Sequence, residues 1–258
     1  MKEVFVEGKT LPEAYHKALK ALHEHGQVLE CDYQTETSVQ KEIPMTFYVE
    51  NAMAEPMISR LAICGPDALQ QYVMEMLDGI LDFEIGQPNK WSYTYHDRMV
   101  NNHGVNQLEY VKEELERAWY TRRAIISFRD SLVDTKVGDP ACLQHMQFFI
   151  RDEKLHLKVV MRSNDATEAT FMNAFAFIML QKRLADMLGI EVGSYTHRAN
   201  SFHCYEKDFA LLEGYVHGLE VRPLEMLTYD YEGDWKEIME DSIPQINEMV
   251  ENQRSKLV

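Results

Sequence analysis

The residues that could perform chemistry lie between positions 122 and 205, in the second half of the chain. A cysteine thiolate can act as a nucleophile, and an arginine can bind a phosphate through two parallel hydrogen bonds. An amide inside an apolar stretch needs polar partners, so it indicates a binding role or a buried network. The candidates are Arg122 with Arg123, Cys142 in Asp139-Pro140-Ala141-Cys142, Arg162 with Ser163, Asn173, and His203 with Tyr205.

Each candidate also has an ordinary structural interpretation. A cysteine shortly after a proline is more often a small buried residue than a nucleophile. An arginine pair at the start of a strand often keeps a sheet edge soluble. His203 and Tyr205 could be packing residues with polar tips. Their order and spacing together therefore carry more information than any single residue.

Length and charge exclude several classes of protein. The chain has 258 residues, with 26 Lys and Arg against 42 Asp and Glu, a net charge of −16 and 45% apolar residues. A core is therefore expected, and DNA or RNA is not expected as the main partner, because binding along phosphates needs clustered basic residues. The four cysteines are scattered and no apolar run reaches 18 residues, so we expect a cytoplasmic protein that does not bind membranes.

Capping residues and periodicity predict several helices. Thr10 with Glu13 forms a capping box before a helix, and Asp165 with Glu168 predicts the start of a second capped helix that ends near Gly189. The second helix is apolar on nearly every side and should be buried. Further helices are expected at 66–77, 106–120, 205–217 and 234–254, the last one interrupted at Pro244.

Strands fill most of the space between these helices. Alternating or apolar runs predict strands at 45–49, 123–128, 146–150, 154–163 and 190–197. Asp152 and Glu153 lie between two of these runs and predict a turn. The sequence shows no linker and no repeat, so we expect one α+β domain over residues 1–258.

The candidate residues, taken together, resemble thymidylate synthase. That family has an arginine pair, a cysteine nucleophile after a proline, an Arg-Ser-x-Asp segment, a helical Asn and a His-x-Tyr in the same order. Here Arg122 lies 20 residues before Cys142, Cys142 lies 20 before Arg162, Arg162 lies 11 before Asn173, and Asn173 lies 30 before His203. The segment from Trp91 through Tyr95 to Arg98 is similar to the archaeal type of the family.

The resemblance implies a fold and a reaction. The fold would be a twisted mixed β-sheet with helices on one face, while the other sheet face forms a homodimer interface. The reaction would convert dUMP to dTMP with a reduced folate, either 5,10-methylenetetrahydrofolate or a modified tetrahydropterin, as the one-carbon donor. Cys142 would add as a thiolate to C6 of the pyrimidine, and nearby Arg162 would lower its pKa.

The resemblance also implies roles for the other residues. Arg162 and Ser163 would bind the 5′-phosphate, and Arg122 and Arg123 would reach that phosphate from the neighbouring subunit. Asn173 would recognise uracil, since its amide can donate to O4 and accept from N3–H. The remaining implied roles are sugar binding by His203 and Tyr205, pterin binding by Asp165, a water network at the base for Tyr95, and acid–base catalysis by Glu75.

Glu75 is the least direct of these assignments. Counting back from Gly79 places the family's catalytic Glu near Gln71 or Tyr72, and Glu75 is the only well-placed carboxylate on that helix. The phosphate-binding arginine of the N-terminal loop has no match in 31–40, and the closing segment of the family has none in 254–258.

One alternative function fits the sequence nearly as well, and another fits it less well. A pyrimidine nucleotide hydroxymethylase, acting on dUMP or dCMP, would share the same steps until water replaces hydride at the end. Relatives of that kind that act on cytosine carry Asp where this chain has Asn173. A relative that only binds nucleotide or RNA would not need the thiol of Cys142. No metal is expected, because His23 and His25 diverge on a helix.

Overall fold

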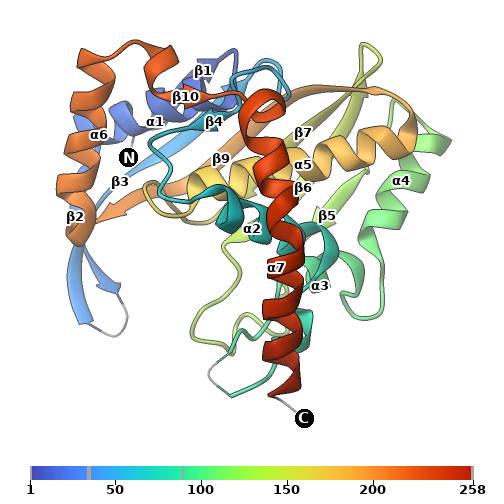
Figure 1. The fold of residues 1–258 in the computed structure, drawn as a ribbon. Coiled ribbons are helices and arrows are strands. Elements are labelled where there is room, and N and C mark those ends of the chain that lie inside the picture. Colours follow the sequence, from blue (N-terminus) through green and yellow to red (C-terminus); the bar gives the residue numbers. More distant parts are fainter. Residues whose placement is uncertain (1, 34–35, 89, 257–258) are drawn as a thin grey trace.

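The computed structural model describes residues 2–33, 36–88 and 90–256 (Figure 1). Eight strands within this part of the chain form one mixed sheet in the order β1-β3-β9-β7-β6-β5, with β2 paired to β3 and β8 paired to β9. The pairs β1–β3, β7–β9 and β8–β9 are parallel and the others are antiparallel. The strands are β1 Val4–Gly8, β2 Gln27–Tyr33, β3 Glu36–Val49, β5 Ile125–Ser127, β6 Leu143–Arg151, β7 Lys154–Met161, β8 Asn164–Asp165 and β9 Glu191–Tyr205. A separate small pair joins β4 Ile58–Ser59 to β10 Thr228–Tyr229.

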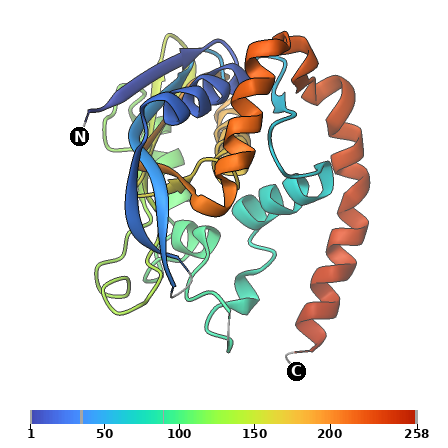
Figure 2. The ribbon, with the colours of Figure 1, turned by 90° about the vertical axis from the view of Figure 1, so that its left-hand side faces the viewer.

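The helices cover one face of the large sheet, as the family resemblance implied. Figure 2 shows α6, α2 and α7 together on one side of the strands. Side chains of β3 alternate between this covered face and the open one: Met45 and Phe47 are fully buried, whereas Thr46 and Tyr48 are partly exposed. Within the described residues, no helix is long and apolar enough to cross a membrane. The helices are α1 Leu11–His25, α2 Pro66–Asp78, α3 Tyr95–Val100, α4 Gln107–Arg117, α5 Thr170–Leu188, α6 Phe209–Val221 and α7 Lys236–Ser255.

The hairpin of β6 and β7 sets the position of the candidate nucleophile. Asp152 and Glu153 form its predicted turn, and both have positive φ (50° and 59°), as a tight two-residue hairpin turn requires. From this turn the register runs to Leu143 opposite Met161 at the far end of the hairpin. The residues just beyond that pair are Cys142 and Arg162, and the backbone N–H of Arg162 donates to the Cys142 carbonyl at 2.8 Å.

The buried helix α5 is confirmed, but the prediction that it starts at Asp165 with Glu168 is wrong. Asp165 belongs to the short strand β8, and its carboxylate accepts hydrogen bonds from the backbone N–H groups of Thr167 and Glu168 at 2.9 Å. These bonds stabilise a turn instead of a helix, and the helix begins at Thr170. Gly189 ends it in the left-handed conformation, with φ 68°.

The C-terminal helix also differs from the prediction. We expected an interruption at Pro244, but α7 continues through it. A proline inside a helix removes one backbone hydrogen bond, and here packing of α7 against α2 holds the helix together. Ile246 and Val250 of α7 are buried against Met74 of α2. The strands β1, β2, β4, β8 and β10 and the short helix α3 were not predicted.

Candidate active site

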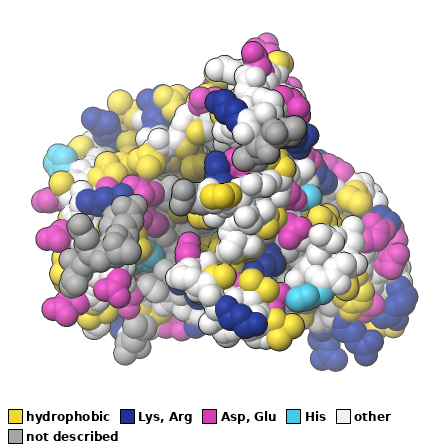
Figure 3. All heavy atoms as spheres, turned by 90° about the horizontal axis from the view of Figure 1, so that it is seen from below, with side chains coloured by type: hydrophobic (Ala, Val, Ile, Leu, Met, Phe, Trp, Pro, Cys, Tyr) yellow, Lys and Arg dark blue, Asp and Glu magenta, His cyan; other side chains and the backbone are white. Residues whose placement is uncertain are grey.

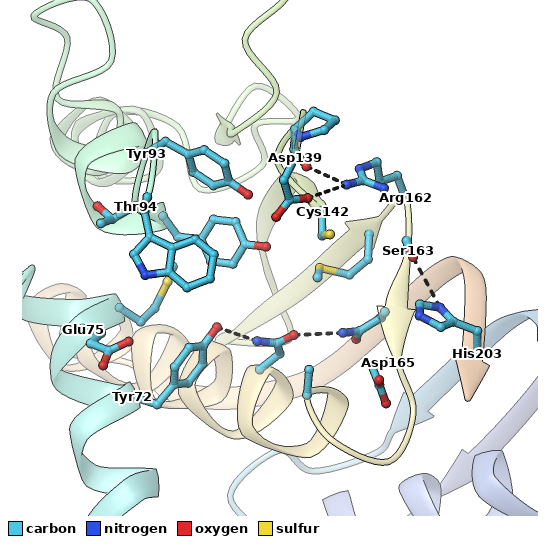
Figure 4. Close-up of a pocket in the computed structure, with 18 of the residues that line it drawn as sticks. Tyr72, Glu75, Tyr93, Thr94, Asp139, Cys142, Arg162, Ser163, Asp165 and His203 are labelled. Carbon is cyan, nitrogen blue, oxygen red and sulfur yellow. Dashed lines mark hydrogen bonds and ion pairs between the residues drawn. The ribbon is translucent and has the colours of Figure 1, made fainter. Parts of the chain in front are cut away.

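A cavity of about 640 Å³ lies where the strand ends meet helix α2 (Figure 4). Its walls come from α2, from residues 91–95 before and at the start of α3, from the loop 138–142, from the segment 161–169 between β7 and α5, and from the end of β9. This volume lies in the range of small-molecule sites. Arg162 is the only Lys or Arg among the described residues that line it. Seen from below, acidic side chains are scattered over this face and not gathered at one place (Figure 3).

Cys142 lines this cavity beside Arg162, as the hairpin register requires. The Arg162 side chain donates to the carbonyl of Pro140 at 2.6 Å and to that of Ala141 at 3.2 Å, and its Nη2 lies 3.4 Å from Asp139 Oδ1. The guanidinium is therefore fixed to the loop that carries the thiol. It brings the one positive charge of the cavity close to the sulfur.

The pKa of Cys142 does not shift in the predicted direction. Burial raises the pKa of the Cys142 thiol, and the Asp139 carboxylate raises it further. The Arg162 guanidinium acts in the expected direction and lowers this pKa, but its effect is smaller than that of burial. The predicted effect of Arg162 on this pKa is therefore present, but burial outweighs it in the free protein.

The loop before Cys142 is held by a buried ion pair. Arg98 of α3 contacts Asp134 at 2.7 Å, and it also donates to the backbone carbonyl of Phe128 at 2.7 Å. Tyr95, at the start of the same helix, lines the cavity, and its hydroxyl accepts the backbone N–H of Leu143 at 3.2 Å. The short helix α3 thus fixes both ends of the segment that presents the thiol.

Asn173 projects from α5 into the same cavity, and only 7% of it is exposed. Its amide oxygen accepts from Asn164 Nδ2 at 2.9 Å, and its amide nitrogen donates to the Tyr72 hydroxyl at 2.5 Å. A primary amide has two N–H groups and two oxygen lone pairs, so one donor and one acceptor of Asn173 remain for a ligand. Figure 4 shows Tyr72 on α2 joined to this amide.

Ser163, His203 and Tyr205 form the wall at the strand ends. The Ser163 hydroxyl lies 3.3 Å from His203 Nδ1, and the rings of His203 and Tyr205 meet edge to face at 4.8 Å. All three line the cavity, and Figure 4 shows Ser163 and His203 on the same side as Arg162. Hydroxyl, imidazole and phenol groups placed in this way can bind the hydroxyls of a sugar.

Aromatic side chains form the opposite wall. Tyr93, Tyr95 and Trp91 all line the cavity, and 58% of Trp91 is exposed. Glu75 of α2 lies on this side and accepts from Gln71 Nε2 at 2.7 Å. Burial raises the pKa of the Glu75 carboxyl above its ordinary value. A carboxyl with a raised pKa holds a proton closer to neutral pH, which suits general acid–base chemistry.

Asp165 also lines the cavity and lies near two other acidic residues. Carboxylate oxygens of Asp165, Glu168 and Asp208 lie within 4.8 Å of one another. Lys207 Nζ contacts Glu168 at 2.7 Å and Asp208 at 3.7 Å, so an ammonium already balances part of this charge. One oxygen of Asp165 caps the turn described above. This cluster alone does not indicate a metal site.

Arg122 and Arg123 do not line the cavity of their own chain. Both are exposed and lie just before β5. The other predicted site residues all line one cavity: Cys142, Arg162, Ser163, Asn173, His203, Tyr205, Tyr95, Glu75 and Asp165. No role was predicted for Tyr72, Tyr93, Trp91 or Asn164. Tyr72 falls at a position reached by counting back from Gly79, and that count could have identified it.

Comparison with known proteins agrees with this geometry. Residues 74–253 match the family model described as thymidylate synthase. A Methanocaldococcus jannaschii protein named "Putative thymidylate synthase" is 30% identical over 217 residues, which cover 80% of this chain and 93% of that protein. A Methanosarcina barkeri protein of the same name is 30% identical over 217 residues, which cover 83% and 95%. A Bacillus mojavensis thymidylate synthase is 28% identical over 127 residues, which cover 49% and 45%.

The fold also resembles a solved structure. Thermostable thymidylate synthase A from Bacillus subtilis superposes with a TM-score of 0.66 over 81% of this chain and 84% of that one. The two sequences are 17% identical, so this similarity concerns the fold alone.

Proposed function

Since this chain belongs to the thymidylate synthase family, we propose that it methylates dUMP to dTMP with a reduced-folate donor. One observation carries this proposal. A cysteine thiol, a single arginine and a buried amide with a spare donor and acceptor line one cavity. These three groups match the three parts of the nucleotide that the reaction needs to hold: C6, the phosphate and the edge of the base.

Cys142 is the proposed nucleophile. Its thiolate attacks C6 of the pyrimidine, and the electron pair of the C5–C6 double bond moves to C5 and O4. C5 then becomes nucleophilic, which uracil C5 otherwise is not. Nε and Nη2 of Arg162 donate to the loop carbonyls and to Asp139, whereas Nη1 has no hydrogen bond among the described residues, so the guanidinium can still bind an incoming phosphate and stabilise the thiolate. Ser163 adds a hydroxyl beside it.

We propose that the residues of the other wall transfer protons and bind the one-carbon donor. Burial raises the pKa of Glu75, which suits proton transfer, and the Tyr95 hydroxyl accepts the backbone N–H of Leu143, the residue after the nucleophile. We propose that His203 and Tyr205 bind the sugar. A reduced folate, when bound, supplies the one-carbon unit and, for methylation, a hydride.

The residues present fit a pterin. Trp91 and Tyr93 offer flat apolar surface at the cavity, and Asp165 offers a carboxylate to a cyclic amidine. We assign these residues to folate binding, and activity with each donor in turn distinguishes tetrahydrofolate from a modified tetrahydropterin.

A second subunit would complete the phosphate site. Only Arg162 supplies positive charge among the described residues of the cavity, although a nucleotide monophosphate carries close to two negative charges at neutral pH. Arg122 and Arg123 are exposed away from their own cavity. We propose that they reach the phosphate of a partner subunit across a homodimer formed by the open sheet face.

Incubation with dUMP and 5,10-methylenetetrahydrofolate tests the function. Methylation yields a product 14 Da heavier than dUMP and dihydrofolate absorbance, whereas hydroxymethylation yields a product 30 Da heavier and no dihydrofolate, by the masses of the added groups (about 14 and about 30). A product of the second kind would replace the methyltransferase by the hydroxymethylase. No change in dUMP with either folate or a tetrahydropterin donor, in a protein that binds dUMP, would contradict both.

A further inference from the structure

A chain of five hydrogen-bonded side chains runs from the core of the molecule to the cavity. The Tyr195 hydroxyl lies 2.7 Å from His197 Nδ1, and His197 Nε2 lies 2.9 Å from Asn164 Oδ1. Asn164 Nδ2 donates to Asn173 Oδ1, and Asn173 Nδ2 donates to the Tyr72 hydroxyl. Tyr195 and His197 are fully buried, whereas Tyr72 lines the cavity. The mechanism above uses only Asn173 from this chain.

The direction of each hydrogen bond among these five side chains constrains the direction of the next one. An amide oxygen can only accept, so His197 Nε2 must carry the proton if it faces Asn164 Oδ1, and Nδ1 must then accept from Tyr195. Reversal would put the His197 proton on Nδ1, turn both amides over and make Tyr72 the donor to Asn173. In both directions every donor between His197 and Tyr72 meets an acceptor, because the tyrosine hydroxyl can either donate or accept.

Tyr195 decides between the two directions. In the first direction its hydroxyl hydrogen is bonded to His197 Nδ1. In the reversed direction His197 Nδ1–H would donate to Tyr195, and the hydroxyl hydrogen of this fully buried residue would need another acceptor. Among the described residues, His197 Nδ1 is the sole hydrogen-bond partner that the Tyr195 hydroxyl has. A buried donor without a partner is costly, so the first direction prevails.

The His197 ring is fixed and uncharged. It stacks on Phe47 at 4.7 Å with an interplanar angle of 4°, and it stacks on Phe177 at 6.5 Å with an angle of 13°. Burial between these rings lowers the pKa of His197 to about 3. The imidazole therefore carries one proton at neutral pH, and the position of that proton sets the orientation of both amides.

We propose that Tyr195, His197 and Asn164 are positioning residues that hold the Asn173 amide in the orientation that recognises uracil. This inference rests on the proposed function, in which Asn173 contacts the base. With Oδ1 toward Asn164 and Nδ2 toward Tyr72, the amide accepts N3–H of uracil and donates to O4. The reversed amide would donate to N3 of cytosine and accept from its 4-amino group.

Asn164→Asp is the sharpest test, because it should reverse Asn173. A carboxylate at position 164 has no donor. One of its oxygens can accept from His197 Nε2–H, and the other can only accept a hydrogen bond at Asn173, so Asn173 must turn its amide nitrogen toward position 164. The Kd values for dUMP and dCMP, measured by calorimetry without folate, give the preference. We expect the wild type to prefer dUMP by on the order of a hundredfold and Asn164→Asp to prefer dCMP.

Asn164→Leu is the matched control, because leucine keeps the branched shape of asparagine but its side chain has no polar atom. It frees Asn173 to adopt both orientations, so the preference for dUMP should fall about tenfold without reversing. Tyr195→Phe should have a similar, smaller effect from a site at the far end of the chain. Thermal unfolding of each variant shows that it is folded before its affinities are compared.

The tautomer of His197 provides a measurement that does not depend on any ligand. We expect ring-¹⁵N NMR to show His197 protonated at Nε2 in the wild type and to show a mixture in Tyr195→Phe. Protonation of His197 at Nδ1 in the wild type would overturn the proposed positioning role of these residues. An unchanged preference for dUMP over dCMP in folded Asn164→Asp and Tyr195→Phe would overturn it as well. If the wild type binds neither nucleotide, the proposed function fails, and the NMR result still decides the direction of the chain.

Discussion

The two walls of the cavity are built in different ways. The wall with Cys142, Arg162 and Ser163 stands on strand ends, where backbone pairing fixes each residue against its neighbour. The wall with Tyr72 and Glu75 stands on α2, which packs on α5 and α7 through side chains. Backbone pairing leaves a residue few alternative positions, whereas side-chain packing between helices tolerates the substitution of one residue by another. The strand wall carries the spacing that resembles the family, whereas the family's catalytic Glu has no direct match on the helix wall.

Removal of the thiol should have the largest effect and tests the strand wall. Cys142→Ala should abolish turnover, because no other group on this wall can add to C6. Binding of dUMP should change only a few fold, since the phosphate and base contacts remain. Release of tritium from C5 and calorimetric binding measure the two effects. Near-normal turnover in this variant would remove Cys142 from the mechanism.

The base contact lies where the two walls meet, and its change should have the next largest effect. Asn173→Asp should lower the preference for dUMP over dCMP by more than about a hundredfold, because a carboxylate accepts from the cytosine amino group and, when protonated, donates to N3. The measurement is kcat/KM for both nucleotides. A wild type that uses dCMP as well as dUMP would show that Asn173 does not select the base.

The helix wall can be tested at Glu75. Glu75→Gln keeps the hydrogen bond from Gln71 but cannot exchange a proton, so turnover should fall about a hundredfold. Turnover unchanged within about twofold would move the acid–base role elsewhere on this wall, with Tyr72 as the neighbouring candidate.

Glu75→Gln should lower turnover but raise the stability of the folded protein at neutral pH. Burial raises the pKa of Glu75 in the folded state above its unfolded value, so the folded state favours the protonated carboxyl. The ionised form therefore weakens folding, and this loss appears as pH rises from the unfolded pKa through the folded one. Glu75→Gln should raise Tm by about 1–3 °C at pH 7 and leave it unchanged near pH 4. Scanning calorimetry across this pH range gives the answer.

Complementation between inactive variants should show a smaller effect, and it tests whether a partner completes the strand wall. Arg122→Ala mixed with Cys142→Ala gives heterodimers in which one of two sites has both residues. At equal mixing about half of the dimers are of this kind, so about a quarter of wild-type activity should return. Native mass spectrometry confirms that heterodimers form. Their presence without activity would refute the role of Arg122 across the interface.

The strand wall of the cavity could be predicted from the sequence more completely than the helix wall. The family resemblance carried by the spacing of Cys142, Arg162 and Asn173 predicted that they share a site, and all three line one cavity. Their elements were visible in the sequence, because a hairpin and a long apolar helix leave clear patterns of turns and periodicity. Tyr72 received no predicted role, since its contact with Asn173 depends on how two helices pack. His197 lies at an inward position of β9, and a lone polar residue there shows no partner until the fold brings Asn164 to it.

The start of α5 was misplaced for a similar reason. Asp165 followed by Glu168 has the composition of a helix cap, but β8 pairs with β9 and keeps Asp165 extended. Long-range strand pairing is not visible in a capping pattern. The fold class and the helix-covered face were predicted correctly, while the dimer on the open face stays a prediction.

The two-residue turn at Asp152 and Glu153 has a consequence for the order in which the site assembles. The hairpin that it closes brings Cys142 to Arg162 across only 20 residues of chain, so little loop entropy is lost before the strands pair. The bond from Asn173 to Tyr72 spans 101 residues and needs most of the domain to be folded. Contacts that are close in sequence generally form earlier in folding. The thiol and its arginine should therefore meet first, and the α2 side of the cavity should close over them last.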